Sequence, residues 1–282
     1  MAGPFRSFWF GGPLSPLEHL CAKSFLAHGH RFQLYAYEEV GNLPEGCELL
    51  DAATIVPRDR LFLYAHSDHA GTPAGFSNLF RYTLLDRHGG WWVDSDVLCL
   101  RSKIDEPEYV FAMQDKSYYN VAILRAPRGG LLIRTALERA TARVDAEGAE
   151  IPFGSIGPNL FTELVPELGF TDRAAERTAL YPIPYWEGLR TCDPARRAEV
   201  EARVAESTFL HLWTGTFRGA GVPTTARPPA GSYLAEAYER YEVPFPVETE
   251  FDWWPVLLPR RPGWKRRITP LPGFTRRSPF NS

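Results

Sequence analysis

Apolar positions near the start of the chain change from strand-like to helix-like spacing and back. Residues 5–11 form an apolar segment that predicts a first strand, and alternation over residues 32–37 predicts a second. Ser15 and Glu18 have the spacing of a capping box, which predicts a helix over residues 16–27. Strand, helix and strand at this spacing predict a right-handed crossover and therefore a parallel sheet.

The middle of the chain continues this alternation. We expect a short third strand over residues 49–52 and a loop over residues 57–75, where Pro, Gly and polar residues gather. Further strands are predicted over residues 109–114 and 120–125, and a helix over residues 131–144. The pattern predicts an α/β fold with a twisted, largely parallel sheet flanked by helices.

One segment adds chemistry to the pattern. Residues 76–88 carry apolar side chains at helical spacing, and Gly89 stands where a helix C-terminus favours a left-handed residue. The apolar segment Trp91–Val93 predicts a buried strand, and Asp94 and Asp96 follow it directly. A helix, a glycine stop, a strand and two carboxylates therefore succeed one another.

Buried carboxylates are unfavourable unless a positive group lies beside them. A hard divalent cation meets that need, because it takes oxygen ligands and also binds phosphate oxygens. Asp94 and Asp96 therefore predict a metal–diphosphate site. The competing interpretation is a chance pair of aspartates in a turn at a strand end.

A basic residue lies on the helix before this strand. Ser77, Asn78 and Arg81 share one helix face by their spacing, and the helix is otherwise mostly apolar. The guanidinium therefore needs an anionic partner nearby. An ordinary ion pair with Asp94 or Asp86 is one interpretation, and a diphosphate held by the same aspartates is the other.

At this point the sequence resembles family 32 of the glycosyltransferases, which includes bacterial polysaccharide and yeast mannosyl enzymes and is similar in core to the large glucosylating toxins. Residues 76–101, FSNLFRYTLLDRHGGWWVDSDVLCLR, resemble its Asp-x-Asp sugar-binding region. The resemblance covers most of residues 5–235, and the usual Asp of the family is replaced by Asn78. The other similar segments are Ser7–Leu14, Ser24–His30, Asp51–Ala52, Gly157–Pro158 and Phe209–Trp213.

The resemblance implies a GT-A-like nucleotide-diphospho-sugar transferase fold in one catalytic domain over residues 1–258. It implies metal-dependent transfer, with Mn²⁺ or Mg²⁺, of a hexose or N-acetylhexosamine from a UDP-sugar to a glycan, lipid-linked or other hydroxyl acceptor, with retention. Asp96 would be a direct metal ligand, Asp94 would contact the ribose, the sugar or the metal, and His211 would be the third ligand. A lone His in an apolar segment is otherwise typical of a structural residue.

The expected catalytic groups are Asp94, Asp96 and Arg81. Trp9 either stacks on the nucleotide base or belongs to the core. Residues from Gln114 to Asn120 and around Gly157–Pro158 are expected to orient the acceptor. The full set of expected substrate contacts is Trp9, Gly11, Ser77, Asn78, Arg81, Asp94, Gln114, Asn120, Gly157, Pro158 and Trp213.

Composition narrows the class of protein further. The net charge of −3 argues against a main role in nucleic-acid binding. No apolar run approaches the roughly 20 residues of a membrane helix, and the first residues lack the pattern of a secretion signal. Four widely separated cysteines, including a predicted buried Cys99, favour a reducing compartment. We therefore expect a cytoplasmic enzyme.

Residues 259–282 form a basic, Pro-rich tail. It is interpreted either as a solvated end or as a peripheral contact with the anionic inner face of a membrane. Two rival functions also remain at this stage. A phosphohydrolase of the haloacid dehalogenase type ends its first strand with Asp-x-Asp, and a non-catalytic carbohydrate-binding relative would agree with eight tryptophans and Asn78.

Overall fold

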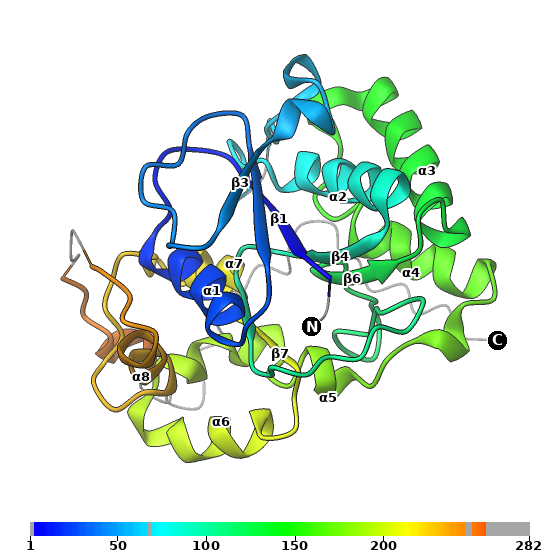
Figure 1. The fold of residues 1–282 in the computed structure, drawn as a ribbon. Helices are drawn as coiled ribbons and strands as arrows, with labels where there is room; N and C mark the ends of the chain where they lie inside the picture. Colours follow the sequence, from blue (N-terminus) through cyan, green and yellow to red (C-terminus); the bar gives the residue numbers. More distant parts are fainter. Residues whose placement is uncertain (1–2, 67–68, 246–249, 258–282) are drawn as a thin grey trace.

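A computed structural model describes residues 3–66, 69–245 and 250–257 of the chain. Its centre is a five-stranded sheet in the order β3-β2-β1-β4-β6, with a separate pair of strands, β5 and β7 (Figure 1). The strands are β1 (Phe5–Trp9), β2 (Phe32–Ala36), β3 (Glu48–Asp51), β4 (Gly90–Val93), β5 (Val97–Cys99), β6 (Ile123–Ala126) and β7 (Phe209–His211).

Four strands of the central sheet run in the same direction, and β6 alone runs antiparallel to its neighbour β4. The order places β1 beside both β2 and β4, with Phe5 opposite Phe32 on one side and Trp91 on the other. The chain therefore leaves β1 in one direction to build β2 and β3, and returns to its other side for β4. The predicted α/β fold with a mostly parallel sheet flanked by helices is confirmed.

Helices cover both faces of this sheet. The α-helices are α1 (Pro16–Ala27), α2 (Ala74–His88), α3 (Leu131–Glu147), α4 (Pro158–Glu167), α5 (Arg177–Leu180), α6 (Arg197–Val204), α7 (Thr214–Gly219), α8 (Tyr233–Arg240) and α9 (Trp254–Leu257). Short 3-10 helices lie at Ala52–Thr54, Arg58–Arg60, Gly148–Glu150, Thr171–Arg173, Tyr185–Cys192 and Pro194–Arg196. In Figure 1, α2 and α3 lie together on one side of the sheet and α1 lies on the other.

The two tryptophans of β4 show how the sheet divides the core. Successive side chains of a strand point to opposite faces. Trp92 accordingly packs in the cluster that contains Phe80 of α2, whereas Trp91 packs in the cluster that contains Phe25 of α1. Both rings are only 1% exposed. A strand buried on both faces explains why this segment is continuously apolar up to the aspartates.

Several local predictions are confirmed. Ser15 caps α1 through the capping box with Glu18, and α2 ends at Gly89, whose φ of 63° lies in the left-handed region. A β-carbon at Gly89 would also lie 2.6 Å from the backbone nitrogen of Arg128. Glycine is required there for both conformation and space.

The prediction of a strand over residues 109–114 is wrong. That segment makes only single bridges, from Val110 to Arg125 and from Met113 to Tyr119, because the loop that follows Gln114 folds back on it. The strand expected over residues 120–125 is shorter and later, at Ile123–Ala126. The loop expected over residues 57–75 contains a 3-10 turn and the first residues of α2.

A second layer is built below the sheet by the later part of the chain. Strands β5 and β7 pair antiparallel, and helices α6 and α8 pack with them around a third apolar cluster that includes Leu98 and Leu210. Cys99 of β5 is buried, as predicted. Within the described part of the chain, no helix has the length and apolar character needed to cross a membrane. The basic tail, residues 259–282, lies outside the described residues.

Candidate metal and nucleotide site

The two aspartates lie at the edge of the sheet where open α/β folds bind ligands. Strands β1 and β4 are parallel neighbours, so Trp9 at the end of β1 and Asp94 directly after β4 emerge at the same edge. The direction of sheet growth changes between these two strands. The crevice outside the carboxyl ends at such a switch point is the usual ligand site of this architecture.

Asp94 is held by groups from three segments. Its backbone N–H donates to the carbonyl of Ala122 at 2.8 Å, and the indole N–H of Trp92 donates to Oδ1 at 2.8 Å. The Nη2 atom of Arg81 lies 3.0 Å from the same Oδ1. The ion pair with Asp94 is therefore the one that forms, while the other expected partner, Asp86, lies by Arg134.

The guanidinium of Arg81 is fixed on all sides. Nη1 donates to the carbonyl of Val121 at 2.5 Å, Nη2 donates to Oγ of Ser77 at 3.1 Å, and the group lies over the ring of Trp92 at 5.0 Å. Its side chain is 4% exposed, whereas that of Asp94 keeps 26%. Burial raises the pKa of Asp94 against the attraction of Arg81, and the charge of Asp96 raises it further. The negative charge of Asp94 is therefore only partly balanced, and part of its side chain is exposed.

Asp96 lies two residues further on and is almost enclosed. Its Oδ1 lies 3.1 Å from Nε2 of His211, and its Oδ2 accepts from both the backbone N–H and the hydroxyl of Thr214, at 2.9 and 2.8 Å. Burial acts to raise the pKa of Asp96, but His211 and the hydrogen bonds from Thr214 outweigh it and hold that pKa well below its ordinary value. Asp96 is therefore held in place as an ionised carboxylate.

The segment after β7 is shaped to deliver these groups. Trp213 has φ 58° and ψ 57°, a left-handed conformation that is uncommon outside glycine. That turn starts α7 and points the N–H of Thr214 back to Asp96. The Trp213 ring is 8% exposed, lies 3.9 Å from the ring of His211 and donates its N–H to the carbonyl of Ile183. Trp213 thus packs behind the site.

Three side chains in this group have the arrangement of metal ligands. One ligand atom from each of Asp94, Asp96 and His211 lies within 4.8 Å of the others. Adjacent ligands of an octahedral ion at about 2.1 Å are about 3 Å apart, close to the 3.1 Å between Asp96 and His211. Two carboxylates and one imidazole at this spacing therefore fit a divalent cation.

Gln114 and Asn120 lie behind Asp94 and support its strand. Both side chains are buried, and the amide of Asn120 donates to Oε1 of Gln114 at 2.6 Å. Asn120 also accepts from the N–H of Ala122, while the carbonyls of Val121 and Ala122 receive Arg81 and Asp94. The segment 120–122 therefore positions the charged groups.

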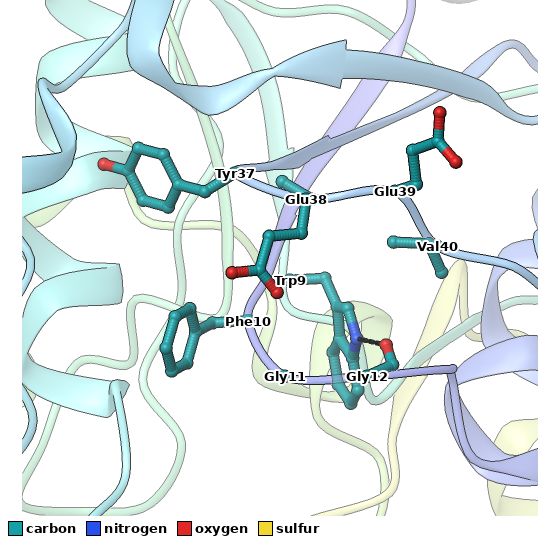
Figure 2. A pocket seen from close by; sticks show the side chains of 9 residues that line it. Trp9, Phe10, Gly11, Gly12, Tyr37, Glu38, Glu39 and Val40 are labelled. Atoms are coloured by element: carbon teal, nitrogen blue, oxygen red, sulfur yellow. Dashed lines mark hydrogen bonds between the residues drawn. The ribbon is translucent and has the colours of Figure 1, made fainter.

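The end of β1 borders a shallow pocket (Figure 2). It is lined by Trp9, Phe10, Gly11 and Gly12 after β1 and by Ala36, Tyr37, Glu38, Glu39 and Val40 at the end of β2. Trp9 is half-buried, and its indole N–H donates to the carbonyl of Gly12 at 3.0 Å. Gly11 has φ 103°, a conformation that glycine alone adopts freely. One indole face thus forms a wall of the pocket.

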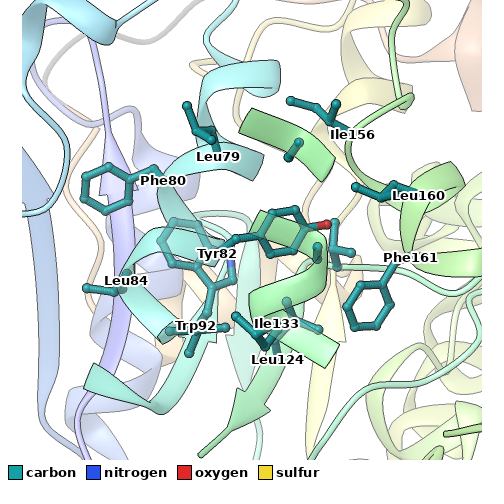
Figure 3. Packing of buried hydrophobic residues seen from close by; sticks show 14 of the residues in the cluster. Leu79, Phe80, Tyr82, Leu84, Trp92, Leu124, Ile133, Ile156, Leu160 and Phe161 are labelled. Atoms are coloured by element: carbon teal, nitrogen blue, oxygen red, sulfur yellow. The ribbon is translucent and has the colours of Figure 1, made fainter. Parts of the chain in front are cut away.

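Asn78 and Gly157 are in direct contact. Tyr82 of α2 and Phe161 of α4 stack with their ring centroids 6.5 Å apart, and both belong to the buried cluster of which Figure 3 shows a part. A β-carbon at Gly157 would lie 2.8 Å from Nδ2 of Asn78. Asn78 itself is only 6% exposed. The structure thus places Asn78, Gly157 and Pro158 together beside Arg81.

Thr214 and Tyr181 contribute to the site, but the sequence analysis predicts no role for them. Thr214 holds Asp96, and the Tyr181 hydroxyl accepts from the N–H of Ile123 at 3.2 Å and lies 3.4 Å from Oδ1 of Asn120. Tyr181 carries no local signal in the sequence. Thr214 has one, because it directly follows Phe209–Trp213, the apolar segment that is expected to return to the cleft.

A family model described as "Capsular polysaccharide synthesis protein" matches residues 65–124, a segment that contains Arg81, Asp94 and Asp96. A comparison with curated protein sequences gives no match.

Among solved structures, the chain is similar to the PaToxG glycosyltransferase, with 11% identity and a TM-score of 0.44 over 87% of this chain and 86% of that one. It is also similar to the apo form of the glycosyltransferase GlyE of Streptococcus pneumoniae TIGR4, with 12% identity and a TM-score of 0.45 over 91% of this chain. The match spans 62% of GlyE, so this chain corresponds to only part of that protein.

Proposed function

We propose that this protein is a metal-dependent glycosyltransferase of GT-A-like fold. It would transfer a hexose or N-acetylhexosamine from a nucleoside-diphosphate sugar, with UDP as the expected nucleotide, to a hydroxyl acceptor. The observation that carries the proposal is the convergence of Asp94, Asp96 and His211 within 4.8 Å at the switch point of the sheet, next to the buried Arg81. Carboxylates, an imidazole and a guanidinium together suit a diphosphate and its cation.

The pocket between the ends of β1 and β2 suits the nucleoside. The half-buried indole of Trp9 offers a flat apolar face for a base. Glu39 follows β2, where open α/β folds place the carboxylate that accepts hydrogen bonds from ribose hydroxyls. From there the diphosphate would extend along the sheet edge toward Asp94 and Asp96.

Negative charge develops on the leaving diphosphate as the glycosidic bond breaks. Mn²⁺ or Mg²⁺ held by Asp96, His211 and Asp94 would offset this charge as a Lewis acid. Arg81 supplies a fixed positive charge behind Asp94, so little reorganisation is needed when the charge develops. Thr214 and Trp213 keep Asp96 and His211 in place throughout.

We infer a retaining, front-face course for the transfer. In this proposal Asp94 and Asp96 are both assigned to the cation, and Arg81 and His211 already contact them, so neither carboxylate is proposed to attack the sugar carbon. The departing phosphate oxygen would take the proton of the acceptor hydroxyl as that hydroxyl attacks from the same face. Asn78, beside Gly157, would contact the donor sugar.

The rival functions fit less well. The phosphohydrolase alternative requires its nucleophilic Asp after the first strand, whereas Asp94 follows β4 and is paired with Arg81. The match of residues 65–124 to capsular polysaccharide synthesis proteins supports a role in building a bacterial surface polysaccharide. A purely carbohydrate-binding role leaves the buried cluster of Asp94, Asp96 and His211 unexplained.

The test is donor hydrolysis in the absence of acceptor. A panel of UDP-, GDP- and dTDP-sugars is incubated with the protein and Mn²⁺, and nucleoside diphosphate release is followed. Release from at least one donor, abolished by chelation and restored by Mn²⁺, supports the proposal. If no donor is hydrolysed and calorimetry with Mn²⁺ shows no binding of UDP or GDP, the proposal fails.

A further inference from the structure

A continuous chain of aromatic rings leads from the metal-site histidine to the protein surface. The ring of His211 lies 3.9 Å from that of Trp213, Trp213 lies 6.2 Å from Tyr185, and Tyr185 lies 5.0 Å from Trp186. Trp213 is 8% exposed, whereas Trp186 is 55% exposed. The row of rings thus begins in the interior beside His211 and ends in solvent at Trp186.

The exposure of Trp186 separates it from most tryptophans of the fold. Trp91, Trp92, Trp213 and Trp253 are buried. A single exposed aromatic residue needs no explanation by itself. Here, however, Trp186 and Tyr185 meet at 83°, so one ring supports the other edge-on and leaves a face of the indole open.

Polar groups border this aromatic surface. Gln114, the residue before Asp115, accepts a hydrogen bond from Asn120, whose Oδ1 lies 3.4 Å from the Tyr181 hydroxyl. The ring of Tyr181 lies 5.8 Å from that of Trp213, which is the ring neighbour of Tyr185, so the loop after Gln114 belongs to the same region. In agreement, burial and then the charge of Asp115 raise the pKa of Tyr185. Asp115 is held in turn, because its Oδ1 accepts from the N–H groups of Ser117 and Tyr118, and its Oδ2 accepts from Gln114. The loop 115–118 therefore holds the Asp115 carboxylate in a fixed position.

We propose that Trp186, Tyr185 and Asp115 form the acceptor site, and that the acceptor is a saccharide. A pyranose ring has one apolar face of C–H groups and a rim of hydroxyls. The open indole face of Trp186 fits the C–H face, and the carboxylate of Asp115 fits the hydroxyls as a hydrogen-bond acceptor. A lipid tail or a flat apolar partner has no use for that carboxylate.

The inference rests on the proposed function and makes its acceptor specific. A glycan chain bound on Trp186 and Tyr185 would be separated from His211 by one buried ring, that of Trp213, and would therefore lie close to the proposed place of the donor diphosphate. Trp186 belongs neither to the buried core nor to the candidate metal ligands. Removing its ring therefore affects the acceptor surface and leaves the buried groups in place.

The experiment measures saccharide binding directly. Saturation-transfer NMR is recorded on the full protein with UDP and Mn²⁺ and a mixture of cellotetraose, maltotetraose, chitotetraose and mannotetraose. We expect saturation transfer from the protein to at least one of these probes. Trp186→Ala should reduce that signal at least fivefold and Asp115→Asn about threefold, while Trp186→Phe, which keeps a flat ring, should retain most of it.

Trp254→Ala is the matched control, because Trp254 is 70% exposed and belongs to α9 rather than to the loop that carries Trp186. Its signal should equal that of the unmodified protein, and thermal unfolding should show that all variants are folded. Absence of signal from every probe, or equal signals from Trp186→Ala and Trp254→Ala, overturns the inference. Donor hydrolysis reports separately on the proposed function: hydrolysis with unchanged saccharide binding in Trp186→Ala defeats only the acceptor site.

Discussion

The Nε2 atom of His211 lies 3.1 Å from Oδ1 of Asp96, although 115 positions separate the two residues. The antiparallel pairing of β5 with β7 produces this contact, because it places Val97 opposite His211. The carboxylate that precedes β5 therefore meets the imidazole that ends β7. The candidate metal site is thus assembled by a second, two-stranded sheet together with the central sheet.

Removing the ligand carboxylate should abolish turnover. Asp96→Ala is expected to lower donor hydrolysis by at least about two to three orders of magnitude, the scale seen when a main charge-stabilising group is lost. Asp96→Asn should be almost as poor, because it keeps the shape but loses the ligand charge. Nucleoside diphosphate release is measured at saturating Mn²⁺. Full activity of either variant in chelator-treated buffer would contradict the assignment of a metal to this site.

Thr214 should control metal affinity through Asp96. Thr214→Ala keeps the backbone N–H but removes the hydroxyl that donates to Oδ2 at 2.8 Å. Partners that orient a ligand typically contribute 10–100-fold to metal affinity, so Mn²⁺ should bind about tenfold more weakly. Thr214→Ser, which restores the hydroxyl, should recover the affinity. Calorimetric titration of Mn²⁺ gives both values, and equal affinity of the two variants would exclude this role.

Arg81 should be essential for stability as well as for charge. The Arg81 side chain is 4% exposed. Arg81→Met therefore leaves Asp94 without its counter-charge and the carbonyl of Val121 without its hydrogen-bond donor. Breaking a buried pair costs about 3 kcal/mol, the lower part of the range because Asp94 keeps an exposed side. Urea unfolding measures the loss.

Arg173→Gln is the control for this prediction. Its ion pair with Glu108 is more than half exposed on both sides, and such surface pairs contribute at most about 1 kcal/mol. If Arg81→Met and Arg173→Gln unfold at the same urea concentration, the buried pair does not stabilise the fold as the geometry indicates.

Asn78 should influence the choice of donor sugar. An amide both donates and accepts hydrogen bonds, so Asn78→Asp should change the ranking of donor sugars while UDP binding stays within a fewfold. Gly157→Ala should act in the same direction, because a β-carbon there would lie 2.8 Å from the Asn78 amide and must displace it. Hydrolysis across one donor panel ranks the sugars. An unchanged ranking in both variants would count against a sugar contact by Asn78.

The tail remains a prediction from sequence. Residues 260–282 contain seven basic residues and no acidic one, and each basic residue near an anionic membrane contributes about 1 kcal/mol. We expect the intact protein to sediment with anionic vesicles at low salt, and binding should disappear when residues 260–282 are removed. Donor hydrolysis should survive this truncation. Equal sedimentation of the two proteins would show that the tail does not dock.

The local pattern of the sequence was sufficient for the elements that flank the site. The capping box of Ser15 and Glu18, the glycine stop at Gly89 and the strand before Asp94 depend on neighbouring residues, and each has a specific backbone requirement. The mostly parallel sheet followed from the spacing of the first strands. The strand predicted over residues 109–114 does not form. A strand needs a partner for its backbone hydrogen bonds, and the neighbouring loop leaves only single bridges.

Only the tertiary structure decided which groups meet. That Arg81 pairs with Asp94, and that Asn120 and Tyr181 lie behind the site, depends on contacts across 13 to 61 positions of the chain. The left-handed turn at Trp213, which directs Thr214 toward Asp96, occurs at a residue other than glycine, so the sequence does not predict it. Residue types and local backbone preferences, which are set by the sequence, determined which chemical groups are available. The packing of the two sheets determined the distances between those groups.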